Sequence, residues 1–124
     1  MNNAPQSPTV GDRSSSDSAS LDELLDVLAN ERRRVILAVL AEEPMPVDIA
    51  SLARAVTRRE TDATDEQLPT DVLERVQVSL HHVHLPKMDD RGVLVYDREG
   101  VVTEKTPKFD LLLREAETGA FSRQ

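Results

Sequence analysis

Apolar side chains recur three and four residues apart in a series of short segments, and a proline, a glycine or a polar turn ends almost every segment. This spacing places the apolar side chains on one face of a helix, so each segment predicts an amphipathic helix that must pack against the others. The predicted helices cover residues 20–29, 31–42, 48–56, 70–85 and 106–116, with a further turn at 87–90.

Residues that favour helix ends lie at the borders of these segments. Pro44 and Pro46 end the second helix, and Pro86 is expected to kink or end the fourth, because proline lacks the backbone donor that a helix needs. The predicted N-caps are Ser20 (with Glu23 completing a capping box), Asp48, Thr70 or Asp71, and Thr106, which precedes a proline.

Two β-branched runs stand between the fourth and fifth helices. Val93–Asp97 and Val101–Lys105 flank the turn DREG, whose glycine suits a positive φ, so they predict a β-hairpin. Residues 57–69 are polar and aperiodic, and we expect a long loop there. The predicted fold class is α+β, a winged helix-turn-helix with flanking N- and C-terminal helices.

Composition divides the chain into one domain and two tails. Residues 1–20 and 118–124 are poor in large apolar side chains, so we expect both to be disordered around a domain at 21–117. The chain has no cysteine, no apolar run long enough to span a membrane, and no secretory signal, which indicates a cytoplasmic protein. The motifs of the common enzyme classes are also absent, and we expect no catalytic activity and no cofactor.

The net charge is −8, and arginine outnumbers lysine twelve to three. An acidic, lysine-poor surface is typical of proteins that work at very high salt. Net charge usually indicates whether a protein attracts DNA, but adaptation to salt would mask that indication.

The helix at 70–85 is the candidate recognition helix. Leu73, Val76, Leu80 and Val83 share the side expected to face the core. The opposite side, its flanks and neighbouring elements supply the candidate DNA-binding residues Arg58, Arg59, Arg75, Gln77, Val78, His81, His82, Lys87 and Arg98. The same helix face also suits a solvated surface in a domain that binds protein.

Arg32, Arg33 and Arg34 form a second basic group, which either contacts phosphate or pairs with nearby carboxylates. His81 and His84 are one helical turn apart and could share a metal ion, but a third ligand is not evident. We therefore expect no metal site and interpret His84 as a structural residue.

Three stretches carry a family resemblance: ANERRRVILAVL, IASLARAV and VSLHHVHLPKMDDRGVLVYD. They resemble a haloarchaeal winged-helix family of unknown function whose members are mainly described as DNA-binding regulators. The most specific part is L-x-H-x-H-L-P-K-M followed by G-V-L-x-Y-D, and the likeness covers about residues 21–105. The resemblance implies a winged-helix fold and double-stranded DNA as the partner.

Two functions remain open at this point. The first is a homodimeric winged-helix transcription regulator of a high-salt cytoplasm, with Arg98 on the wing. Its expected dimer seam consists of Leu21, Leu24, Leu28, Phe109, Leu112 and Leu113. The alternative is a winged-helix protein–protein interaction module that does not bind DNA.

Overall fold

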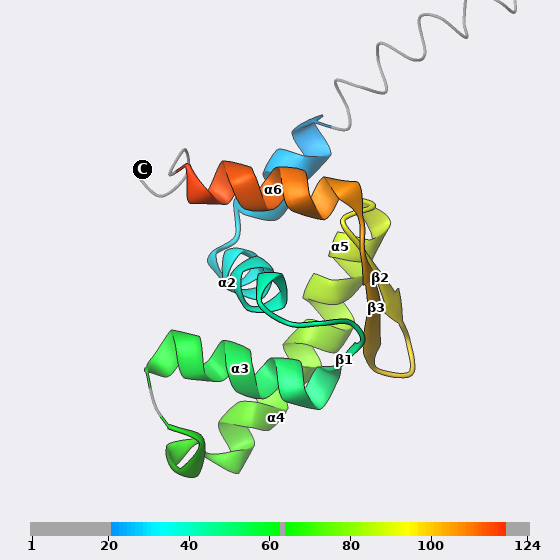
Figure 1. Cartoon of the computed structure of the whole chain (residues 1–124). Helices are drawn as coiled ribbons and strands as arrows, with labels where there is room; N and C mark the ends of the chain where they lie inside the picture. Colours follow the sequence, from blue (N-terminus) through cyan, green and yellow to red (C-terminus); the bar gives the residue numbers. More distant parts are fainter. Residues whose placement is uncertain (1–20, 63, 119–124) are drawn as a thin grey trace, which may run out of the picture.

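The computed structural model describes residues 21–62 and 64–118, in which helices surround a small antiparallel sheet and separate its first strand from the other two along the chain (Figure 1). Residues 21–28 are helical. The elements that follow are α2 (Glu31–Ala41), β1 (Val47–Asp48), α3 (Ile49–Thr61), η1 (Asp65–Gln67), α4 (Thr70–Ser79), η2 (Leu80–His84), α5 (Leu85–Asp90), β2 (Leu94–Asp97), β3 (Val101–Lys105) and α6 (Pro107–Glu117). The predicted α+β class is confirmed. Ser20 and most of the two predicted tails lie outside the described residues.

The helix caps follow the prediction in part. The Asp48 side chain accepts a hydrogen bond from Ser51 N at 2.9 Å, which confirms it as the cap of α3. Thr70 and Asp71 were wrongly expected to cap α4, because Pro69 occupies that position without a side-chain cap. Thr106 precedes α6 as predicted, but its hydroxyl donates to the carbonyls of Gly92 and Val93 instead of capping the helix.

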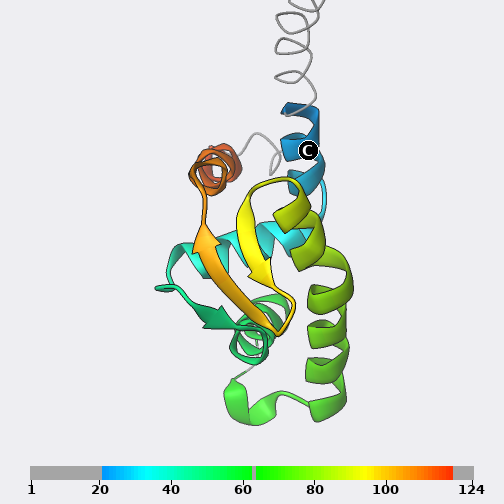
Figure 2. The same cartoon turned by 90° about the vertical axis from the view of Figure 1, so that its right-hand side faces the viewer.

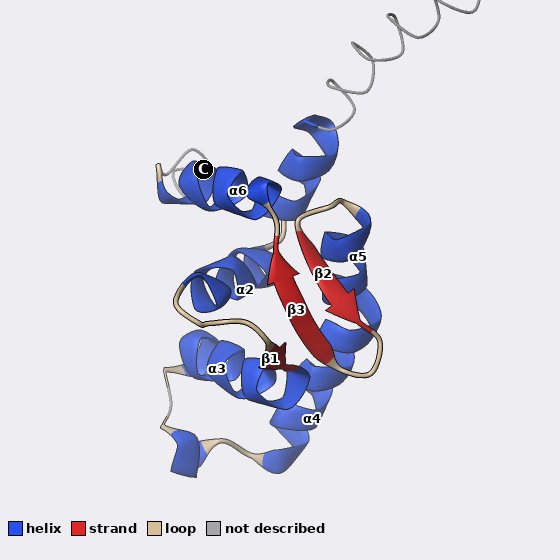
Figure 3. Ribbon diagram, turned by 45° about the vertical axis from the view of Figure 1, so that its right-hand side comes forward, coloured by secondary structure: helices blue, strands red, loops and turns tan. Residues whose placement is uncertain are grey.

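The sheet has three strands in the order β1-β3-β2, all antiparallel (Figure 3). The hairpin of β2 and β3 is confirmed at nearly its predicted limits. The edge strand β1 was missed, because two residues are too few to show an alternating pattern. It forms because Val47 pairs with Val102 on β3.

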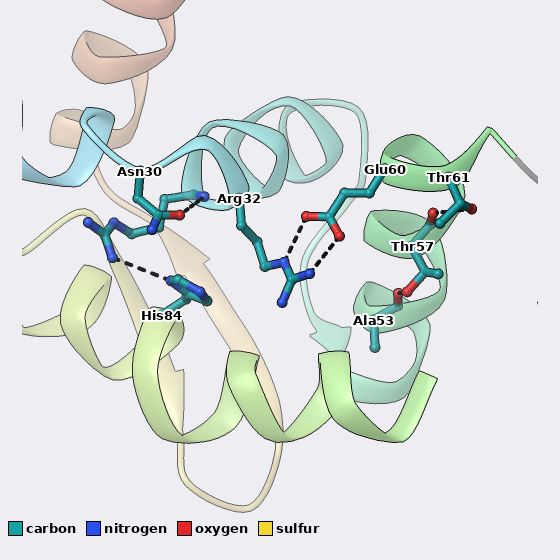
Figure 4. A network of polar contacts seen from close by, with 8 residues as sticks. Asn30, Arg32, Ala53, Thr57, Glu60, Thr61 and His84 are labelled. Carbon is teal, nitrogen blue, oxygen red and sulfur yellow. Dashed lines mark hydrogen bonds and ion pairs between the residues drawn. The ribbon is translucent and has the colours of Figure 1, made fainter. Parts of the chain in front are cut away.

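α3 extends to Thr61, so the expected loop at 57–69 is shorter than predicted. The apolar pattern ended at Val56 because the next inward-facing residue is polar. Thr57 is 1% exposed, and its buried hydroxyl donates a hydrogen bond to Ala53 O of the same helix at 2.7 Å (Figure 4).

Pro86 does not end the helix that was predicted over residues 70–85. α4 continues through the π-helical turn η2 into α5, with Leu85 N donating to Leu80 O five residues earlier. The wide turn rotates the later side chains, so His84 takes the inward position expected for Val83. Val83 is 53% exposed, and its predicted place in the core is wrong, whereas Val76 and Leu80 are buried.

The core fills the space between α2, α3, the α4–α5 helix, the sheet and α6. Four residues expected at a dimer seam belong to this core: Leu24, Leu28, Phe109 and Leu112 are each at most 5% exposed. Their apolar spacing reflects packing within one chain. Because they are buried there, they are not available on the surface for contact with a second chain. Among the described helices, none is long and apolar enough to cross a membrane.

Candidate functional site

One hollow of about 730 Å³ gathers residues from four parts of the chain. We call it the α4 hollow, and it lies between α4, η2, the first residue of α3 and the β2–β3 turn. Figure 2 shows that turn beside the α4–α5 helix. Its lining consists of Ile49, Glu74, Gln77, Val78, His81, His82, Arg98, Glu99 and Gly100.

The hairpin turn is tied to the start of α3. Ile49 N donates to Gly100 O at 2.7 Å, and Gly100 N donates to Asp97 O at 2.8 Å. Gly100 has φ +106°, and a Cβ there would lie 3.3 Å from Ile49 Cγ2. Only glycine adopts this backbone without strain, so Gly100 holds the turn, and with it Arg98, at the hollow.

The helix side of the hollow offers mixed chemistry. Val78 is 56% exposed and His82 is also exposed, while Gln77 and His81 are half-buried. An amide, an apolar methyl pair and two imidazoles therefore face one concave surface. Such a set can hold a partner through hydrogen bonds and apolar contact.

Charge in the hollow is nearly balanced. With neutral histidines, the lining carries the cation of Arg98 and the carboxylates of Glu74 and Glu99. The side chains that face a partner there are therefore more suited to directional hydrogen bonds than to general attraction of phosphate.

Sequence reasoning missed one residue that contacts the lining of the hollow, Tyr96. Its hydroxyl lies 2.5 Å from Nδ1 of His81, and the two rings meet edge to face. The alternation of buried and exposed residues along β2 turns Tyr96 inward, toward η2. This alternation was readable from the sequence, but its partner on η2 was not.

Five of the nine candidate DNA-binding residues line the hollow: Gln77, Val78, His81, His82 and Arg98. The structure does not bring the other four to it.

Arg75 is on α4 but pairs with Asp71 at 3.3 Å along the helix. Lys87 contacts Asp26, which lies in the helical segment 21–28, at 2.7 Å. The carboxyl of Asp26 has a lowered pKa because Lys87 bonds to it, with Arg33 and Arg91 adding positive charge.

The remaining two arginines lie in the last turn of α3. Arg59 contacts Glu42 at 3.3 Å, and Arg58 lies beside Val39 and Glu43 of the α2 region. Both therefore face away from the α4 hollow.

The three consecutive arginines of α2 are engaged within the chain. Arg32 makes a two-bond contact with Glu60, at 2.7 and 2.8 Å (Figure 4). Arg33 is 7% exposed and donates to the carbonyls of Val27 and Asp26, and Arg34 donates to Leu28 O. These contacts favour a structural role for the three arginines over contact with phosphate.

His84 is also structural, as its motif position suggested. Arg33 Nη1 lies 3.3 Å from its Nδ1, and a guanidinium can only donate, so Nδ1 is unprotonated. Burial, followed by the charges of Arg33 and Arg32, lowers the pKa of His84 to about 4. Within the described ranges, no group of three or more histidine, aspartate or glutamate side chains is arranged to hold a metal ion.

Comparison with known proteins gives one match. Residues 25–104, well over half of the chain, match a family described as "Domain of unknown function (DUF7344)", and the chain belongs to this family. No curated protein and no solved structure matches it.

Proposed function

We propose that this member of the DUF7344 family is a winged-helix transcription regulator that contacts DNA through the α4 hollow. The observation that carries the proposal is the convergence of Gln77, Val78, His81 and His82 on one helix with Arg98 on the hairpin turn. In this proposal, α3 and α4 form the helix-turn-helix, α4 with η2 is the recognition helix, and the β2–β3 hairpin is the wing.

The exposed side chains suit the edges of base pairs. A glutamine amide can donate to and accept from adenine, and valine methyl groups can contact the methyl of thymine. Arg98, on the turn, is placed to reach a phosphate or the adjacent minor groove. Together they would supply both base readout and positioning on the backbone.

The acidic composition fits such a role in a high-salt cytoplasm, which we propose as the setting. Attraction to phosphate weakens steeply as salt rises, so short-range contacts must supply more of the affinity. The near-balanced charge of the α4 hollow is consistent with this demand.

We further propose a homodimer, which would read two half-sites about one helical turn apart. Its seam would use the exposed Leu21 and Leu111 together with the half-buried Leu113, because the other expected seam residues are in the core. Light scattering in molar KCl checks this, and a mass equal to that of one chain would contradict it.

The test of DNA binding is a fluorescence-anisotropy titration in molar KCl with fragments from upstream of the protein's own gene. Gln77→Ala should weaken binding by about fivefold to a hundredfold, because a good base contact contributes about 1–3 kcal/mol. Arg98→Ala should weaken binding as well.

The matched control is Arg59→Ala, which removes an arginine that faces away from the hollow. It should leave the affinity unchanged. If the folded wild-type chain retains none of the fragments, the proposal is wrong.

A protein-binding module is the second candidate, and Glu74 and Glu99 in the hollow favour it, since carboxylates repel phosphate. A pull-down with Val78→Asp separates the two functions. The module is supported if the wild type binds a protein partner but no DNA, and Val78→Asp loses that partner. The regulator is supported if the wild type binds DNA but no protein partner, and Val78→Asp loses the DNA.

A further inference from the structure

Tyr96 is held rigidly where it meets His81. Its side chain is 6% exposed, its backbone N donates to Asp89 Oδ2 at 2.7 Å, and it pairs with Val102 across the hairpin. His81 belongs to η2, the turn that also lines the α4 hollow. A fixed hydroxyl therefore contacts a ring that also lines the α4 hollow.

The direction of the hydrogen bond between them follows from their chemistry. A phenol is a good donor and a weak acceptor, whereas an unprotonated imidazole nitrogen is a strong acceptor. Burial raises the pKa of Tyr96, so its hydroxyl keeps the proton that it donates. Nδ1 of His81 is then unprotonated, and the single proton of the neutral ring is on Nε2.

We propose that Tyr96 is a positioning residue that turns Nδ1 of His81 toward the sheet and presents Nε2–H as a hydrogen-bond donor in the α4 hollow. This inference rests on the proposed DNA-binding function and names what His81 recognises. A partner atom at that place must be an acceptor.

In the major groove, guanine presents two adjacent acceptors, N7 and O6. Adenine and thymine each present a single acceptor there, so guanine fits the donor of His81 best, beside the adenine and thymine contacts available to Gln77 and Val78. Three neighbouring side chains of one helix would then favour three different bases.

The first test needs no DNA. Long-range ¹H–¹⁵N spectra of the full chain, at a mildly alkaline pH where histidine is neutral, report which ring nitrogen carries the proton. We expect His81 to have a protonated Nε2 and a hydrogen-bonded, unprotonated Nδ1. Tyr96→Phe should move the Nδ1 resonance of His81 toward the position of a free nitrogen.

His84 is the internal control, because its Nδ1 accepts from Arg33 and should not respond to Tyr96→Phe. A proton on Nδ1 of His81 would overturn the proposal. An Nδ1 resonance that is the same in the wild type and in Tyr96→Phe would overturn it too.

The second test is a double-mutant cycle on DNA affinity. Tyr96→Phe should weaken binding about fivefold, which is the effect of one neutral hydrogen bond. In a His81→Ala background it should have no further effect, because Tyr96 acts through His81. Equal weakening in both backgrounds would show a general effect on the fold and contradict the positioning role.

The two proposals fail in different ways. Absence of DNA binding by the wild type removes the regulator function, while the ring spectra still decide whether Tyr96 orients His81. Substitution of 7-deazaguanine in a bound fragment removes N7, and it should weaken the wild type but not His81→Ala. Equal loss in both proteins would contradict guanine recognition by His81.

Discussion

At the scale of single residues, histidines that are close in sequence have opposite environments. His82 is exposed on the α4 hollow, whereas His84 is 7% exposed and accepts a hydrogen bond from the buried Arg33. The sequence alone indicated that His84 is structural, through its place in a motif. It could not show Arg33 as the partner, since the two residues are 51 positions apart.

The buried His84 should make stability depend on pH. Its pKa in the folded chain is about 4, below the ordinary value of 6.5, so between these values the unfolded chain binds a proton that the folded chain does not. The free energy of unfolding should therefore fall as the pH drops from 6.5 to 4, by up to about 3 kcal/mol. This contribution levels off below pH 4.

Urea unfolding of the wild type and His84→Gln at a series of pH values measures this contribution. Glutamine can still accept from Arg33 but does not titrate, so the difference between the two proteins should change only across that interval. His82→Gln is the control and should keep the slope of the wild type. Parallel curves for the wild type and His84→Gln would show that His84 is not responsible.

At the scale of elements, apolar spacing and turn residues predicted most helices and the hairpin. The features that the sequence did not predict depend on hydrogen bonds that an apolar pattern does not show. Thr57 extends α3 because its hydroxyl bonds to its own helix, and β1 exists because β3 offers it a partner. The π-helical turn was also missed, since it inserts one residue into a periodic pattern and moves Val83 out of the core.

The hairpin turn depends on Gly100. Gly100→Ala should lower the free energy of unfolding by about 1–3 kcal/mol, because alanine is strained at a φ of +106° and its Cβ would press on Ile49. Chemical denaturation measures the change. Glu99→Ala, an exposed change in the same turn, should stay within about 0.5 kcal/mol of the wild type. Equal stability of the two variants would show that the turn does not need its glycine.

At the scale of the whole molecule, the candidate site was only partly predictable. Helical geometry placed Val78, His81 and His82 on one face with Gln77 on its flank. The meeting of that face with Arg98 depends on where the hairpin folds back. Most residues predicted for the dimer seam lie instead in the core of the single chain. Leu24 and Phe109 have the spacing of an apolar helix face, and spacing does not tell a core within one chain from an interface between two.

The central proposal is that the α4 hollow contacts DNA. It is tested most directly by NMR of the isotope-labelled full chain in molar KCl, titrated with a fragment from upstream of its gene. The largest shift changes should fall on residues 77–82 and on the turn at 98–100. Changes confined to α6 and residues 21–28, or no changes at all in the folded chain, would contradict the proposal.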